Sequence, residues 1–99
     1  MATYYTYILA TRSRSLDFGV TSNLQRRVGR HRAMEPNRSL GKDGAVRLVY
    51  YEQRTSVEAA LERVREIQRW SYPQVEALIS RSNPNWHDLA MEWFVARRA

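Results

Sequence analysis

The pattern of apolar and polar positions predicts three strands and four helices. Short β-branched and aromatic runs are typical of strands, and apolar residues that recur every three or four positions are typical of amphipathic helices. Strands are expected at Thr3–Ala10, Leu16–Val20 and Val46–Glu52. Helices are expected at about Asn23–Ala33, from Thr55 to about Trp70, from Ser71 to the break at Ser82–Trp86, and from Trp86 into a basic tail. The order β-β-α-β-α-α-α predicts a small α/β (α+β) domain whose first two strands form a hairpin.

Capping residues and apolar stripes indicate how the helices begin and which faces they bury. Ser22 with Gln25, and Thr55 with Glu58, have the spacing of a capping box, and Ser71 begins the third helix. The faces expected to point inward are Val57, Ala60, Leu61, Val64 and Ile67 in the second helix, Val75, Leu78 and Ile79 in the third, and Trp86, Leu89, Ala90 and Trp93 in the last.

The first helix carries polar residues on the stripe that it should bury. Arg27 and His31 share the i, i+3, i+4, i+7 pattern with Leu24 and Val28. An arginine there can hold a phosphate or stabilise a developing anion, and a histidine can move a proton. The alternative is that Arg27 reaches outward to solvent and pairs with Asp17 or a glutamate.

Tyrosines recur along the first strand, where Tyr5 and Tyr7 share one face. A tyrosine hydroxyl near an arginine can act as a base or a nucleophile, because the cation favours phenolate. The alternative is that these tyrosines are core or interface aromatics. In the second strand, Gly19 indicates a close backbone approach or a bulge.

Composition restricts the classes of function. The 99 residues suggest one domain, 1–99, with its core at about 3–89 and a C-terminal helix and basic tail at 86–99. The net charge is +6 and Lys42 is the only lysine, so the basic surface consists of arginine and favours phosphate partners. Cysteine is absent and histidine occurs twice, which excludes disulfides and argues against a zinc site. We expect a cytoplasmic protein without a membrane segment, since no signal peptide or long apolar run is present.

Five segments together resemble the GIY-YIG nuclease superfamily, and most closely its small stand-alone bacterial domains. They are "YYTYIL", "LDFGVTSNLQRRVGRH", "RLVYYE", "REIQRW" and "NPNWHDL", and they extend from Tyr4 to about Leu89. The resemblance implies a three-stranded antiparallel sheet flanked by helices. It also implies metal-dependent cleavage of a DNA phosphodiester, with Mg²⁺ or Mn²⁺ as the cofactor if the domain is active.

The resemblance also assigns roles to individual residues. Tyr7 matches the tyrosine that acts as base or proton relay, Arg27 the arginine that steadies the phosphate, and Asn83 the late asparagine. His31 matches a helix position that is often histidine or tyrosine. Two positions depart from the family pattern: Asp17 replaces the second motif tyrosine, and Val64 replaces the metal-binding glutamate.

The substitution at position 64 leaves no confident metal ligand. Valine offers no oxygen, and Glu62 and Glu66 project about 200° away around the helix. Asp17 could supply a ligand from the strand or form an ion pair with Arg27, and we favour the ion pair because of their opposite charges.

Three functions follow as alternatives. The first is a GIY-YIG-type domain that binds nucleic acid, DNA rather than RNA, through Arg26, Arg27, Arg30 and Arg32, with impaired or absent cleavage. The second is an active divalent-metal-dependent DNA endonuclease that uses Tyr7 and Arg27. The third is a non-catalytic protein-interaction domain.

Overall fold

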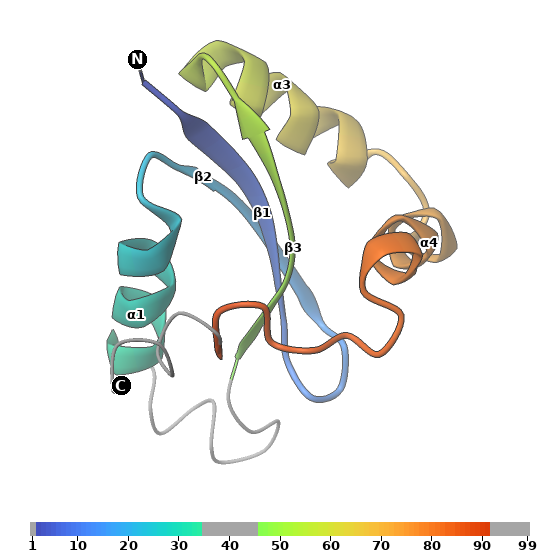
Figure 1. The fold of residues 1–99 in the computed structure, drawn as a ribbon. Helices are drawn as coiled ribbons and strands as arrows, with labels where there is room; N and C mark the ends of the chain where they lie inside the picture. The colour runs from blue at the N-terminus through green and yellow to red at the C-terminus, as the bar shows by residue number, and fades with distance from the viewer. Residues whose placement is uncertain (1, 35–45, 92–99) are drawn as a thin grey trace.

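The computed structural model describes residues 2–34 and 46–91 (Figure 1). The elements are β1 (Tyr4–Ala10), β2 (Leu16–Thr21), α1 (Leu24–Met34), β3 (Arg47–Arg54), α3 (Val57–Gln68) and α4 (Tyr72–Ser82). The predicted fold class and the order of these elements are confirmed. Within the described ranges, no helix has both the length and the apolar character needed to cross a membrane.

The three strands form one antiparallel sheet in the order β2-β1-β3. The central strand, β1, pairs with both neighbours, and Tyr7 lies opposite Gly19 of β2 and Tyr51 of β3. The pairing of β1 with β3 shifts between Ile8 and Leu9. The predicted hairpin of β1 and β2 is therefore confirmed, and it places β2 at one edge of the sheet.

Helices cover both faces of the sheet, as Figure 1 shows, with α1 on one side and α3 and α4 on the other. Alternate residues of β1 point to opposite faces and divide the core in two. The α1 side buries Tyr7, Leu9, Leu24, Val28, Val46, Leu48 and Ala90. The α4 side buries Ile8, Ala10, Val49, Ile67, Val75, Ile79 and Trp86.

Two of the predicted helix caps are wrong by one residue. Asn23, not Ser22, caps α1, because its Oδ1 accepts a hydrogen bond from the amide three residues on at 3.0 Å. Ser56, not Thr55, caps α3, since its Oγ accepts from the amide of Ala59 at 3.1 Å. Both are good caps, and the local backbone decides which of two adjacent polar residues takes the position. The cap at Ser71 is confirmed, and Gln74 completes its capping box.

The buried face of α3 is narrower than predicted. Ala60, Val64 and Ile67 are buried, whereas Val57 and Leu61 are 37% and 39% exposed. The buried positions follow the i, i+4, i+7 spacing of one narrow stripe that meets the sheet, and the other two lie beside that stripe.

The predicted helix start at Trp86 is wrong. Trp86 has a φ of 53°, outside the range of a right-handed helix, and its side chain is fully buried. The segment continues along β3, where the amide of Leu89 donates to the carbonyl of Leu48 at 2.8 Å. Helical structure begins at Met91, and the remainder of the predicted helix, including Trp93, lies outside the described residues.

Candidate functional site

Tyr7 and Gly19 form a close contact on the α1 side of the sheet. Tyr7 is 6% exposed, and it lies directly opposite Gly19 in the β1–β2 pair. A Cβ atom built at position 19 would lie 2.3 Å from the Tyr7 hydroxyl oxygen, so the ring crosses the glycine backbone. The predicted close backbone approach at Gly19 is therefore confirmed, and its cause is the Tyr7 ring.

Two further predicted site residues, Arg27 and Asp17, act electrostatically on the Tyr7 hydroxyl. Burial raises the pKa of Tyr7, the positive charge of Arg27 lowers it, and the negative charge of Asp17 raises it. The net effect places the pKa of Tyr7 above its ordinary value of 10.0. The phenol therefore stays protonated at neutral pH, and in this state it can donate a hydrogen bond to an anion.

The side chains of Asp17 and Arg27 are both exposed. Both are described residues, and they form no ion pair with each other, so the pairing that we favoured from the sequence is wrong. Arg27 also does not lie on the buried stripe with Leu24 and Val28. At about 100° per residue, position 27 is about 100° from position 28, which turns its side chain out of the contact with the sheet.

The start of α1 carries a surface hollow that we call the arginine hollow. It has a volume of about 220 Å³ and is lined by Thr21, Ser22, Asn23, Arg26, Arg27 and Arg30. None of these described lining residues is acidic. In the described parts of the chain, no carboxylate forms an ion pair with any of its three arginines. The hollow therefore concentrates positive charge that is open to solvent.

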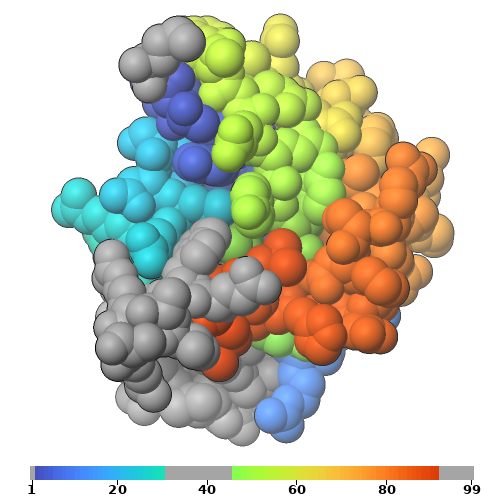
Figure 2. Space-filling model, in the orientation of Figure 1, coloured from blue at the N-terminus to red at the C-terminus, as the bar shows by residue number. Residues whose placement is uncertain are grey.

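A second hollow, the tyrosine hollow, adjoins the first. It has a volume of about 340 Å³ and is lined by Tyr5, Ser22, Asn23, Leu24, Gln25, Tyr51 and Gln53. The rings of Tyr5 and Tyr51 meet edge to face, with centroids 6.0 Å apart. Figure 2 shows this face, where the blue of β1 lies between the cyan segment that leads into α1 and the green of β3. Ser22 and Asn23 line both hollows, so the two are adjacent.

The structure does not bring Asn83 to this surface. Its side chain is 4% exposed on the α4 side of the sheet. Its Nδ2 donates to the carbonyls of Val49 at 3.0 Å and His87 at 2.9 Å, and its Oδ1 accepts from the amide of His87 at 3.0 Å. Asn83 thus joins the end of α4 to β3 and to the segment that follows.

Two further predicted residues, His31 and Arg32, belong to α1 through their backbone. Their side chains lie outside the described part of the structure, so their predicted roles stay predictions. Arg26 and Arg30 are exposed and line the arginine hollow.

The described residues do not fit a divalent metal at position 64. Val64 is 8% exposed, and α3 covers the face of the sheet opposite to α1. Among the described residues, no three histidine, aspartate or glutamate side chains gather at one place. Glu62 and Glu66 are exposed, as predicted, and Glu66 forms an ion pair with Arg63 at 2.9 Å. Magnesium and manganese prefer several oxygen ligands, which this part of the chain does not supply.

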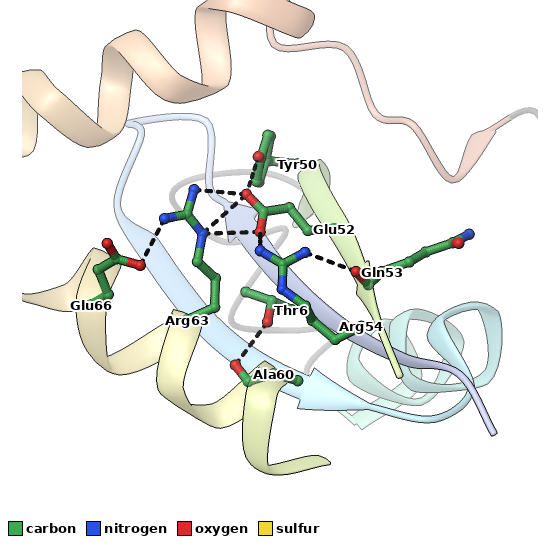
Figure 3. A network of polar contacts seen from close by, with 8 residues as sticks. All are labelled: Thr6, Tyr50, Glu52, Gln53, Arg54, Ala60, Arg63 and Glu66. Atoms are coloured by element: carbon green, nitrogen blue, oxygen red, sulfur yellow. Dashed lines mark hydrogen bonds and ion pairs between the residues drawn. The ribbon is translucent and has the colours of Figure 1, made fainter. Parts of the chain in front are cut away.

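A polar network that was not predicted from the sequence joins β3 to α3 (Figure 3). Glu52 accepts hydrogen bonds from Tyr50, from Arg54 at 2.6 Å and from the Arg63 Nε at 3.0 Å. Nearby, the Thr6 hydroxyl donates to the carbonyl of Ala60 at 2.8 Å. The charge of Glu52 at the end of the third strand could have indicated such a network. Its partner Arg63, however, lies 11 residues further along the chain, on α3.

The network changes the acidity of its members. Burial acts to raise the pKa of Glu52, but the hydrogen bonds from Arg63 and Tyr50 and the charges of Arg63 and Arg54 outweigh it, so the pKa lies below 4.5. Burial, together with the hydrogen bond to Glu52, raises the pKa of Tyr50 to about 12. Glu52 is therefore ionised and Tyr50 neutral at neutral pH.

Fold and surface together define a class: a small α+β domain with one three-stranded sheet and a basic, tyrosine-bearing surface beside the first helix. No protein-family profile matches the chain. A UPF0213 protein of Natronomonas pharaonis is 34% identical over 79 residues, which are 80% of this chain and 93% of that relative. The chain belongs to the UPF0213 family.

A solved structure agrees with this assignment. The solution NMR structure of a UPF0213 protein from Bacillus halodurans is similar to this chain, with a TM-score of 0.56 and 26% sequence identity. The similarity covers 87% of this chain and 92% of the solved one.

Proposed function

We propose that this chain is a nucleic-acid-binding domain of the GIY-YIG type, in which phosphodiester cleavage is impaired or absent. The observation that carries the proposal is the arginine hollow, where Arg26, Arg27 and Arg30 are exposed around one depression of about 220 Å³. Together with the net charge of +6, it favours a polyanion as the partner.

Arginine suits a phosphate partner for a geometric reason. Its planar guanidinium presents several N–H donors to phosphate oxygens, and it keeps its charge at every physiological pH. Each phosphate that is neutralised releases condensed counterions, so binding should weaken as salt rises.

Impaired cleavage follows from two positions in the GIY-YIG pattern. A metal-dependent phosphodiesterase relies on its ion to stabilise the leaving oxygen, and Val64 offers no ligand for such an ion. Asp17 stands where the pattern has its second tyrosine, and it places a negative charge near the phosphate. Neither position lines the arginine hollow, so the arginines available to bind a phosphate remain in place.

Fluorescence anisotropy with labelled DNA, measured over a range of salt concentrations, tests the binding. Two triple variants remove equal charge: Arg26→Ala, Arg27→Ala and Arg30→Ala at the hollow, and Arg65→Ala, Arg69→Ala and Arg81→Ala at α3 and α4. We expect the first to reduce the magnitude of the negative slope of log K against log salt by about 2 to 3, because each phosphate contact contributes roughly 0.7 to 0.9. The control should change the slope far less.

Equal losses in the two variants would mean that overall charge, not the hollow, binds the DNA. No binding by the unmodified protein at low salt would contradict the proposal itself and favour a protein-interaction domain.

A plasmid-nicking assay with Mg²⁺ or Mn²⁺ tests the loss of cleavage. We expect no nicking by the unmodified protein. The double variant Asp17→Tyr, Val64→Glu, which carries both residues of the GIY-YIG pattern, is assayed in parallel with the unmodified protein. Nicking by the unmodified protein that Tyr7→Phe and Arg27→Ala both abolish would instead support the alternative, an active endonuclease.

A further inference from the structure

The tyrosine hollow adjoins the arginine hollow, and its chemistry differs from that of a phosphate site. We infer that it receives an unpaired base of the strand whose phosphate lies in the arginine hollow. The protein would then select single-stranded or locally unpaired nucleic acid over duplex. This inference rests on the proposed function, and it names the class of nucleic acid that the same surface takes.

Two tyrosine rings supply the stacking surface. Tyr5 is half-buried and packs against the α1-side core, and its ring meets that of Tyr51 at an interplanar angle of 72°. The side chain of Tyr51 remains 37% exposed. Aromatic faces held in this way bind bases by stacking, and they do so without strong preference for sequence.

Amide side chains line the hollow around these rings. Gln25 and Gln53 each carry both a donor group and an acceptor group, which are the groups that pair with base edges. Asn23 presents its Nδ2 donor, because its Oδ1 accepts from the amide of Arg26 at the start of α1. The hollow's volume of about 340 Å³ lies at the small end of the ligand-pocket range, roughly 300 to 1,000 Å³. It is therefore suited to one nucleotide unit rather than to the flank of a duplex.

The adjacency of the two hollows indicates the form of the ligand. Because Ser22 and Asn23 line both, a group stacked on the tyrosines lies next to an anion held by the arginines. A nucleotide can place its base in the tyrosine hollow and its phosphate in the arginine hollow at the same time. In a duplex the base faces are covered by their neighbours, and exposing one requires the cost of unstacking it.

A pair of single strands with equal charge isolates the contribution of the base. One is an oligothymidylate, and the other has the same length and the same phosphates but abasic sugars. We expect the unmodified protein to bind the abasic strand on the order of 5-fold or more weakly, in line with stacking on an aromatic side chain. Equal affinity for the two strands overturns the inference and leaves the proposed function intact. No binding of either strand also overturns the inference, and it overturns the proposed function only if labelled duplex DNA does not bind either.

A tyrosine variant locates the effect on the protein. We expect Tyr51→Ala to weaken binding of oligothymidylate and to leave binding of the abasic strand unchanged. Tyr72→Ala is the matched control, because Tyr72 is 44% exposed on α4 and lines neither hollow. An equal loss in both variants overturns the inference, and if Tyr51→Ala does not fold, Gln53→Ala takes its place.

A free mononucleotide carries the same chemistry as one unit of a strand. Thymidine monophosphate is therefore added as a competitor. We expect it to compete only at concentrations at least 100-fold above those of oligothymidylate, because it offers a single phosphate to three arginines. Competition at equal concentration overturns the assignment to a strand.

Discussion

The ring of Tyr7 needs the space that only glycine leaves at position 19. We expect Gly19→Ala to lower the free energy of unfolding by about 2 kcal/mol, because the new Cβ would overlap the Tyr7 ring in a packed region. Gly29→Ala is the matched control, since nothing lies within 4 Å of a Cβ at that position in α1. It should raise stability by about 1 kcal/mol through helix propensity. Urea unfolding followed by circular dichroism measures both changes.

A double-variant cycle assigns the cause. If the Tyr7 ring makes Gly19 necessary, Gly19→Ala should cost much less in a Tyr7→Leu background. An unchanged cost would mean that strand backbone, not the ring, requires the glycine.

The pKa of Tyr7 depends on the charges of Asp17 and Arg27. We expect Asp17→Asn to lower the pKa of Tyr7, because it removes a negative charge, and Arg27→Gln to raise it. Titration followed by NMR of tyrosine labelled with ¹³C at Cζ measures each tyrosine separately. If the pKa of Tyr7 does not change in either variant, the charges of Asp17 and Arg27 lie too far from the Tyr7 hydroxyl to affect it.

Residue-level predictions from the sequence succeeded where the spacing is unambiguous. The period of two placed Tyr5 and Tyr7 on one face, and Gly19 in a strand indicated the close contact. They failed for Arg27, which lies at the margin of the helical stripe, where one step of rotation separates buried from exposed. The three hydrogen bonds of Asn83 also could not be predicted, because their partners become neighbours only after folding.

At the scale of elements, Glu52 connects β3 to α3. We expect Glu52→Gln to lower the free energy of unfolding at pH 7 by about 2 kcal/mol, because it removes a charged acceptor from Arg63 and Arg54 in a partly buried site. The pKa of Glu52 is lower in the folded protein than the ordinary 4.5. This contribution is therefore present above about pH 4.5 and lost as the pH falls below it.

The pH dependence provides the measurement. Urea unfolding of the unmodified protein and of Glu52→Gln should differ fully at pH 7 and much less at pH 3. A difference that stays constant between these pH values would mean that the substitution acts through packing and not through the charge of Glu52.

The elements themselves were largely predictable, because each strand and helix is a continuous stretch with one dominant period. Their ends were less so: Ser22 and Asn23 are adjacent, and both are good caps. The tyrosine hollow could not be predicted, because β1, β3 and the start of α1 contribute to it from widely separated parts of the chain. Only the pairing of β1 with both other strands brings these segments together.

At the scale of the whole molecule, the sheet separates two cores. We expect Ile79→Val, on the α4 side, to lower the free energy of unfolding by about 1 kcal/mol through the loss of one buried methylene. Affinity for DNA should stay within two-fold, because both hollows lie on the α1 side. Thermal unfolding and anisotropy measure the two effects. A parallel loss of stability and affinity would indicate that the two sides are coupled.

The position of Asp17 in β2 has a consequence for self-association. β2 is an edge strand, and such an edge can pair with the same strand of another copy. Asp17, exposed near the start of Leu16–Thr21, opposes that pairing, because a charged side chain on an edge strand disfavours its contact with another strand. With tyrosine at position 17 the strand would read Leu-Tyr-Phe-Gly-Val-Thr, an uncharged run rich in β-forming residues. Restoring the motif tyrosine would therefore remove a protection against aggregation.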